Sequence, residues 1–293
     1  MPGGKETEKR KDTMDMKQKR YTLGLYEKAM PEVSWPEKLR IAKEAGYDFV
    51  EISIDASEEK IARVYSSRAE RKQLTDWMYE LEMSIRTLNA SALTKYALGD
   101  PDPDVRGRGL DIASRAIGLA EDLGVRILMI PGYDVYFKPH SDETERLFEA
   151  AIRELSLQAA VAGVQLAFET MENDFMNTVG KGLAWVDRIG SNYLKLYPDI
   201  GNTTNGCLPL GIDPAEDLRS GGAAVAALHL KETKPGIYRE TPYGTGHVDF
   251  DRAVEAAWSI GVRRYVTEFW YQPDGETPEY VCRRFRALLD RQV

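Results

Sequence analysis

The sequence predicts an α/β protein, a single (β/α)8 barrel built from residues 21–293. The first observation behind this prediction is the alternation of short aliphatic runs with longer segments of helical period, repeated eight times. The second is the length of 293 residues, since one such barrel needs about 250. A doubly wound open sheet is the competing architecture. It has fewer units and a phosphate-binding glycine loop after its first strand, which the segment GLYEKAMPE does not supply.

The expected strands are short runs rich in β-branched and aliphatic residues. A helical segment follows each of them, so the strands are expected to lie parallel. In chain order they are TLGLY (22–26), FVEISI (49–54), SIRTLNA (84–90), VRILMI (125–130), VQLAFE (164–169), LKLYPD (194–199), AALHL (226–230) and RYVTEF (264–269).

The expected helices cover residues 35–45, 68–82, 105–122, 142–162, 178–190, a short segment near 214–219, 249–260 and 278–291. Two helix starts carry clear capping residues. Ser141 precedes an acidic first turn, and Asp249 precedes the run FDRAV. Both residue types accept hydrogen bonds from the free N–H groups at a helix start, so these two boundaries are well marked.

The first twenty residues, MPGGKETEKRKDTMDMKQKR, are polar and charged, and we expect them to form a disordered tail. They contain no apolar segment of a signal peptide, and no stretch of the chain approaches the ~20 apolar residues of a membrane span. Cys207 and Cys282 are the two cysteines, and their spacing indicates neither a disulfide framework nor a zinc-thiolate site. These features predict a soluble protein of the cytoplasm with no membrane partner.

The charge balance argues against nucleic acid as a partner. The formal net charge is -8, whereas binding to a phosphate backbone needs a basic face. The hydrophobic share of 43% is ordinary for a globular protein with a sizeable core. We therefore expect no nucleic-acid partner.

Four consecutive strands in the second half each end in, or carry near their end, a potential metal ligand. The active sites of such barrels form at the carboxyl ends of the strands, so the four side chains are expected at one rim. They are Glu169, Asp199, His229 and Glu268.

Each of these residues by itself has an ordinary structural explanation. An acidic residue after a strand often caps the next helix or pairs with a lysine, and a single histidine among aliphatic residues is usually part of the core. Together, however, the four cost several kcal/mol per ion to bury unless a cation compensates them. The sequence therefore predicts a divalent metal ion, and the oxygen-rich set with one nitrogen suits Mn²⁺, Mg²⁺, Co²⁺ or Zn²⁺ equally.

Six further segments occur in order between residues 24 and 250: GLYEKAMP, DFVEISID, PGYDVYF, LYPDIGN, HLKETKPG and PYGTGHVDF. On these segments the chain resembles the L-ribulose-5-phosphate 3-epimerases, also called L-xylulose-5-phosphate 3-epimerases, of ascorbate utilisation. More broadly it is similar to the xylose-isomerase-like TIM barrels, which include the ketose 3-epimerases. The resemblance covers nearly everything after the tail. The family's metal set of Glu, Asp, His and Glu falls on the same four residues.

The resemblance implies an isomerase that inverts C3 of a ketopentose phosphate, from L-ribulose 5-phosphate to L-xylulose 5-phosphate. Members of the family use the two metal-bound glutamates, here Glu169 and Glu268, to remove the C3 proton and to return one from the opposite face. The reaction passes through a cis-enediolate, which a divalent ion on the C2 and C3 oxygens stabilises. The resemblance also implies a small-molecule partner, a sugar phosphate, and a homodimer. Which glutamate serves which epimer is left open.

Two departures from the epimerases of free ketohexoses point to a phosphorylated substrate. Those enzymes carry His three residues after the aspartate ligand and Arg six after the histidine ligand, where this chain has Asn202 and Pro235. We expect Asn202 to contact the substrate. A third departure counts the other way, because the family often places His shortly after the third strand, where this chain has Leu93.

Four more residues are candidates for substrate contact. Lys231 and Lys234 follow the ligand strand and can neutralise a phosphate, although lysines in such loops are more often only solvated. Tyr133 and Tyr136 of PGYDVYF follow the fourth strand and can bound the pocket; their ordinary role is packing at the rim with the hydroxyls in water.

Two alternatives stay open beside the ketopentose-phosphate epimerase. One is another enzyme on the same scaffold, such as a free-ketose 3-epimerase, an aldose–ketose isomerase or a dehydratase, because one metal enediolate site can serve all of these. The other is a non-catalytic sugar-phosphate binder. Two glutamates at facing positions speak against the binder, since binding requires no acid–base pair.

Overall fold

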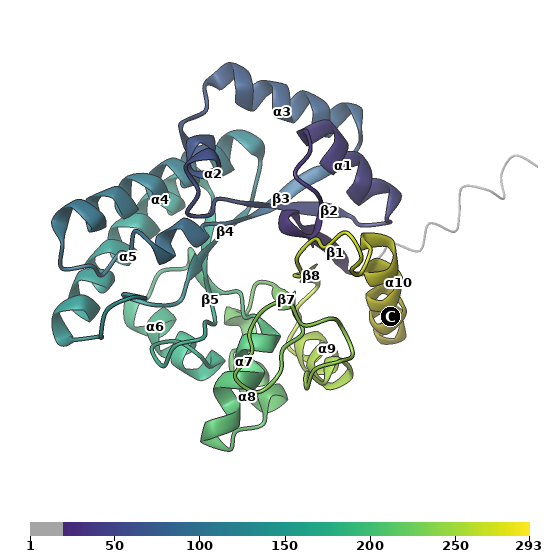
Figure 1. Cartoon of the computed structure of the whole chain (residues 1–293). Helices are drawn as coiled ribbons and strands as arrows, with labels where there is room; N and C mark the ends of the chain where they lie inside the picture. The colour runs from purple at the N-terminus through teal and green to yellow at the C-terminus, as the bar shows by residue number, and fades with distance from the viewer. Residues whose placement is uncertain (1–19) are drawn as a thin grey trace, which may run out of the picture.

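The protein is described by a computed structural model over residues 20–293, and the predicted tail of residues 1–20 lies outside this range except for Arg20. Eight parallel strands form one curled sheet with the helices packed around it (Figure 1). The strand order is β6-β5-β4-β3-β2-β1-β8-β7. The predicted α/β barrel class is confirmed.

All eight predicted strands are present, several of them shorter than expected. They are β1 (Thr22–Tyr26), β2 (Phe49–Ser53), β3 (Ser84–Asn89), β4 (Ile127–Pro131), β5 (Gln165–Glu169), β6 (Leu194–Leu196), β7 (Leu228–Leu230) and β8 (Arg264–Thr267).

The eight predicted helices are also confirmed: α1 (Trp35–Glu44), α3 (Arg68–Glu80), α4 (Pro103–Leu123), α5 (Asp142–Ala162), α6 (Val179–Ile189), α8 (Pro214–Ser220), α9 (Phe250–Ser259) and α10 (Pro278–Leu289). The side chains of Ser141 and Asp249 accept hydrogen bonds from the N–H groups of Thr144 and Arg252, as their capping role requires. None of the helices in the described range has the length and hydropathy of a membrane span.

Two α-helices were not predicted, α2 (Glu58–Ala62) and α7 (Ile200–Cys207). The sequence of α7, IGNTTNGC, contains two glycines and two asparagines and has low intrinsic helix propensity. Seven of its eight residues are buried, so packing rather than propensity holds this helix in place. Asp199 begins it, because the carboxylate of Asp199 accepts a hydrogen bond from Asn202 N.

The sheet closes between β6 and β7 through two isolated parallel bridges, Leu196 with Val225 and Asp199 with His229. The backbone N–H of His229 donates a 2.9 Å hydrogen bond to Pro198 O. Closure at this point places two of the predicted ligands side by side.

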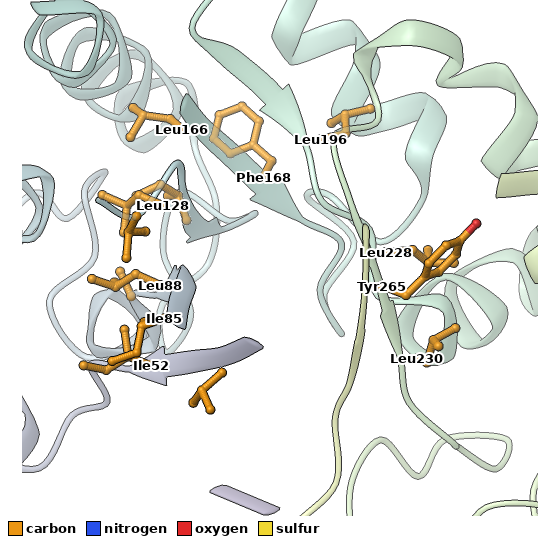
Figure 2. Packing of buried hydrophobic residues seen from close by; sticks show 14 of the residues in the cluster. Ile52, Ile85, Leu88, Leu128, Leu166, Phe168, Leu196, Leu228, Leu230 and Tyr265 are labelled. Atoms are coloured by element: carbon orange, nitrogen blue, oxygen red, sulfur yellow. The ribbon is translucent and has the colours of Figure 1, made fainter. Parts of the chain in front are cut away.

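Successive side chains of each strand point alternately toward the helices and into the barrel. Figure 2 shows the helix-facing layer, which includes Leu166 and Phe168 of β5 and Leu228 and Leu230 of β7. The residues of opposite parity form a separate cluster inside the barrel: Tyr26, Phe49, Ile127, Met129, Ala167, Tyr197, Ala227 and Val266. The parity that sends Ala167, Ala227 and Val266 inward also sends Glu169, His229 and Glu268 inward.

Candidate metal centre and active-site cavity

The four predicted ligands meet inside the carboxyl end of the barrel. Each of them offers one ligand atom such that all four atoms lie within 4.8 Å of one another. Asp199 and His229 are fully buried, and Glu169 and Glu268 keep only 5% and 6% of their surface exposed. The structure therefore brings together residues from four consecutive strand ends, as the sequence predicted.

His229 Nδ1 lies at the middle of this group. It is 2.5 Å from Glu268 Oε2, 3.6 Å from Glu169 Oε1 and 3.9 Å from Asp199 Oδ2. By donor and acceptor geometry, His229 Nδ1 and Glu268 Oε2 have no hydrogen-bond partner within residues 20–293, and Asp199 Oδ2 lacks one beside its ion pair with Lys231 Nζ at 3.1 Å. Buried polar atoms are rarely left without a hydrogen-bond partner, so this cluster, whose ligand atoms lie within 4.8 Å of one another, fits a divalent cation.

The electrostatics of the protein groups alone show how strongly the carboxylates repel one another. Burial raises the pKa of Asp199 to about 7, and the charges of Glu268 and Glu169 add to that rise. Burial and Glu268 likewise raise the pKa of Glu169. For Glu268, burial alone would also raise the pKa, but the charges of Lys231 and His229 outweigh it and hold the pKa well below its ordinary value.

Lys231 is a part of this cluster, not of a solvated loop. Its side chain is buried, with Nζ 3.1 Å from Asp199 Oδ2 and 3.8 Å from Glu268 Oε1. Burial alone would lower the pKa of Lys231, but the three carboxylates raise it above its ordinary value. Lys231 therefore offsets part of their negative charge, and a divalent ion would offset more.

Below the cluster lies Glu51, a residue that the sequence analysis did not single out. It is fully buried on β2, and its Oε1 lies 2.7 Å from His229 Nε2. The hydroxyl of Tyr197 donates a 2.9 Å hydrogen bond to Glu51 Oε2. The signal in the sequence was a glutamate in the otherwise apolar core of FVEIS, because such a residue is almost never buried without a partner.

A cavity of about 230 Å³ opens above the cluster. Glu169, Glu268 and Lys231 form part of its wall, so two of the four candidate ligands face both the cluster and the cavity. The other residues that line it are Tyr26, Lys28, Asp55, Ala56, Asn89, Ser91, Thr94, Met171, Glu172, Asn202, Tyr238, Arg239 and Trp270.

Asn202, which the sequence analysis expects to contact the substrate, lies in this wall. Its backbone N–H donates a hydrogen bond to the carboxylate of Asp199, and its side-chain amide donates a 2.8 Å hydrogen bond to Thr170 O. Its Oδ1 has no hydrogen-bond partner in the described chain. Lys234, by contrast, is exposed in a loop where it bridges Ile237, and it is not among the residues that line the cavity. Lys231 directly follows β7 and keeps the inward direction of His229, whereas the loop that contains Lys234 does not continue this alternation. The structure therefore does not bring Lys234 to the site.

The two predicted tyrosines stand one layer behind the cavity wall. The hydroxyl of Tyr133 bonds to that of Thr94, and the hydroxyl of Tyr136 donates a 2.8 Å hydrogen bond to Glu172. Thr94 and Glu172 line the cavity, whereas the tyrosines themselves are not among its lining residues. Their contact with the site is therefore indirect.

The cavity also contains polar groups that the sequence analysis missed. Asn89 Oδ1 and Ser91 Oγ are buried and have no partner within residues 20–293. Lys28 pairs with Asp55 at 3.1 Å, and Arg239 pairs with Glu172 at 3.2 Å. Lys28 and Ser91 follow strand ends and were open to the same argument as the ligands. Arg239 lies in a long loop, where strand parity predicts nothing.

Comparison with known proteins agrees with this architecture. The family model described as "Xylose isomerase-like TIM barrel" matches residues 39–287. The chain is 37% identical over 257 residues to the L-ribulose-5-phosphate 3-epimerase UlaE of Escherichia coli (strain SE11), covering 87% of this chain and 89% of that protein. The same enzyme of Shigella sonnei (strain Ss046) matches with the same identity and coverage.

Solved structures share the fold at lower identity. The 3-keto-D-glucoside 4-epimerase YcjR of E. coli superimposes with a TM-score of 0.73 at 17% identity, over 92% of this chain and 98% of that one. A structure of L-ribulose 3-epimerase gives 0.71 at 18% identity, over 93% and 95%. A xylose isomerase-like TIM barrel protein from Mycobacterium smegmatis in complex with magnesium gives 0.68 at 17% identity, over 93% and 96%.

Proposed function

The chain belongs to the xylose isomerase-like TIM barrel family and, within it, to the L-ribulose-5-phosphate 3-epimerases, and from this premise we propose that it interconverts L-ribulose 5-phosphate and L-xylulose 5-phosphate with a divalent metal ion. It is an isomerase, a sugar epimerase. The phosphorylated pentulose, the metal dependence and the residue roles given below are the parts that we propose.

The residues present suit a divalent ion. Glu169, Asp199 and Glu268 offer oxygens and His229 offers Nδ1, a set that suits Mn²⁺, Mg²⁺, Co²⁺ or Zn²⁺. The buried ligand atoms that lack a hydrogen-bond partner, His229 Nδ1 and Glu268 Oε2, are the observation that supports this assignment. When bound, such an ion supplies Lewis-acid polarisation of the substrate carbonyl and stabilises negative charge on the adjacent oxygens.

Glu169 and Glu268 are the proposed acid–base pair. They come from β5 and the end of β8, three strands apart around the barrel, and both line the cavity. One carboxylate removes the C3 proton from one face of the sugar, and the other carboxylic acid returns a proton to the opposite face, which inverts C3. Positioned proton transfer of this kind contributes about 10²- to 10⁴-fold to the rate. Two glutamates that both belong to the cluster and face the cavity are the single observation that carries the proposal.

The cavity can also accept a phosphate. Lys231 is occupied by the carboxylates of the cluster, but Lys28 and Arg239 each hold a carboxylate that itself lines the cavity. A phosphate dianion can take the place of Asp55 or Glu172 in these pairs and gain charge-assisted hydrogen bonds. Asn89 Oδ1, Ser91 Oγ and Asn202 Oδ1 remain for the sugar hydroxyls.

The deciding experiment follows deuterium at C3 by proton NMR in D₂O, with metal-loaded protein and, separately, L-ribulose 5-phosphate, free L-ribulose and D-fructose. We expect exchange and inversion with the phosphorylated pentulose. Glu169→Gln and Glu268→Gln should each abolish inversion, because neither amide can transfer the proton. Glu172→Gln is the matched control: it alters a glutamate in the same cavity wall that lies outside the cluster, and it should retain exchange.

The alternatives give different results in the same experiment. Exchange confined to a free ketose would move the protein to the free-ketose epimerases, and formation of an aldose would indicate an isomerase. No exchange with any substrate, in protein with a bound metal ion, would support the non-catalytic binder and contradict the proposal.

The phosphate assignment has its own test. Lys28→Met and Arg239→Met should raise KM for the phosphorylated substrate, while Lys234→Met, outside the cavity, should leave KM unchanged. A rise with Lys234→Met alone would restore the original prediction for that lysine. Function as a cytoplasmic homodimer remains a prediction from the cysteine usage and the family resemblance.

A further inference from the structure

Glu51 has both of its carboxylate oxygens engaged inside the barrel. Oε1 contacts His229 Nε2 at 2.7 Å, and Oε2 accepts the 2.9 Å hydrogen bond from the Tyr197 hydroxyl. All three side chains are fully buried. Glu51 stands on β2, which within residues 20–293 pairs with β1 and β3 and not with β7, so Glu51 reaches His229 across the barrel interior and not along the sheet.

The chemistry of this contact determines which nitrogen of His229 keeps its proton when the ring is neutral, the form in which an imidazole binds a metal ion. A carboxylate only accepts hydrogen bonds, so Nε2 must be the donor to Glu51. In a neutral imidazole the lone pair is then on the other nitrogen, Nδ1. Nδ1 is the atom that faces the carboxylates of Glu169, Asp199 and Glu268, the nearest of which is Glu268 Oε2 at 2.5 Å.

Tyr197 holds this arrangement from a second side. Its ring packs edge-on against the His229 ring, with the centroids 4.7 Å apart and the planes at 69°. Its hydroxyl donates a hydrogen bond to Glu51 Oε2, the carboxylate oxygen that does not contact His229. The ring of His229 is therefore limited in both rotation and tautomer by two buried neighbours.

We infer that Glu51, supported by Tyr197, is a positioning residue that holds His229 in the tautomer and orientation that present Nδ1 to a divalent ion. The inference rests on the proposed metal site and concerns affinity for the ion. Hydrogen-bond partners behind a metal-bound imidazole typically contribute about 10- to 100-fold to metal affinity. Glu51 itself does not touch the substrate cavity.

The test measures the dissociation constant of Zn²⁺ by competition with a chromophoric chelator. Glu51→Gln keeps an acceptor for Nε2–H but loses the charge, and we expect affinity to fall about 10-fold. Glu51→Leu removes the acceptor, and we expect a fall of about 100-fold. Tyr197→Phe leaves Glu51 in place with one oxygen released, so a severalfold loss is expected.

A spectroscopic measurement identifies the tautomer directly. The chain has only three histidines, so ¹⁵N-labelled imidazoles give an assignable spectrum in which His140 and His247 serve as internal references. In the Zn²⁺-loaded protein, His229 should show a metal-bound Nδ1 and a protonated Nε2. In Glu51→Leu, this signature should be lost or mixed with the opposite tautomer, while the reference histidines stay unchanged.

Glu27→Gln is the matched control, because Glu27 is another fully buried glutamate next to a strand end, held by cations instead of by His229. It should lower stability without changing Zn²⁺ affinity. Should Glu51→Leu fail to fold, Glu51→Gln and Tyr197→Phe carry the test. Unchanged affinity in both, or a metal-bound Nε2 in the wild type, would overturn the inference while the metal site stands. A wild type that binds no Zn²⁺ would overturn the metal site and the inference together.

Discussion

Glu27 provides the sharpest prediction about stability. It follows β1 directly and is fully buried, and its carboxylate is surrounded by three cations. Oε1 lies 2.9 Å from Lys38 Nζ and 3.4 Å from Lys60 Nζ, and Oε2 lies 2.7 Å from Arg63 Nη1. Oε2 also accepts a 2.7 Å hydrogen bond from the N–H of Ser53. This network joins the end of β1 to the end of β2.

The magnitude follows from the pKa of Glu27. Burial alone would raise it, but the hydrogen bond and charge of Arg63, with the charges of Lys38 and Lys60, lower it from 4.5 to about 2. At about 1.4 kcal/mol per pKa unit, the ionised carboxylate contributes ~3 kcal/mol to the free energy of unfolding at pH 7. Glu27→Gln keeps the shape and removes the charge, so we expect it to lose about that amount.

The same shift determines the pH dependence. A carboxyl whose pKa is lowered in the folded state stabilises it fully above the ordinary value of 4.5, and this contribution is lost as the pH falls toward 2. The difference between the wild type and Glu27→Gln should therefore shrink from ~3 kcal/mol at pH 7 to ~1.4 kcal/mol at pH 3.

Urea denaturation at both pH values measures this difference. Glu82→Gln, which removes one partner of the exposed Lys43–Glu82 pair, is the control and should leave the midpoint unchanged. A loss below ~1 kcal/mol for Glu27→Gln at pH 7, or a difference that does not shrink at pH 3, would refute the electrostatic reasoning.

Three further predictions concern the site. In Gly132→Ala the new Cβ would lie 2.3 Å from Glu169 O, so the end of β5 must shift. We expect at least a 10-fold fall in kcat and a stability loss of ~1–3 kcal/mol. The control is Gly107→Ala, whose new Cβ would have no atom within 4 Å and should stabilise helix α4. Removal of the metal ion by a chelator should lower Tm and abolish epimerisation, and Mn²⁺ should restore both, because an ion that binds only the folded state stabilises it. A Tm that does not respond to the chelator in differential scanning fluorimetry would contradict the metal site. Lys231→Met leaves the buried carboxylates without their nearby cation. We expect the free energy of unfolding of the metal-free protein, measured by urea denaturation, to fall by ~3 kcal/mol, and added Mn²⁺ to recover part of this loss. Equal losses with and without Mn²⁺ would argue against charge compensation.

Much of the fold could be predicted because its signals are local. Each strand is a short apolar run, each long helix has its own periodic face, and caps such as Ser141 bond to groups three residues away. The segment α7 could not be predicted in this way, because its glycines and asparagines disfavour a helix until the surrounding core packs against it.

The four candidate ligands were also predictable, since parallel strands of one barrel carry their carboxyl ends to a common rim. The partners of these residues were not. Glu51 and His229 are 178 positions apart, and strand parity sends both inward without indicating that they meet. Lys231 and Lys234 look equivalent in the sequence, yet one is buried against Asp199 and the other is exposed.

The sequence by itself therefore determined the eight-unit barrel, the inward face of each strand and the residue types at the strand ends, because these depend on periodicities of two and 3.6 residues along the chain. Only the tertiary structure decided which nitrogen of His229 faces the cluster, which cations line the cavity and which tyrosines stand behind its wall. Those outcomes depend on distances of a few ångströms across the barrel interior, and such distances arise only when strands remote in the chain close around a common axis.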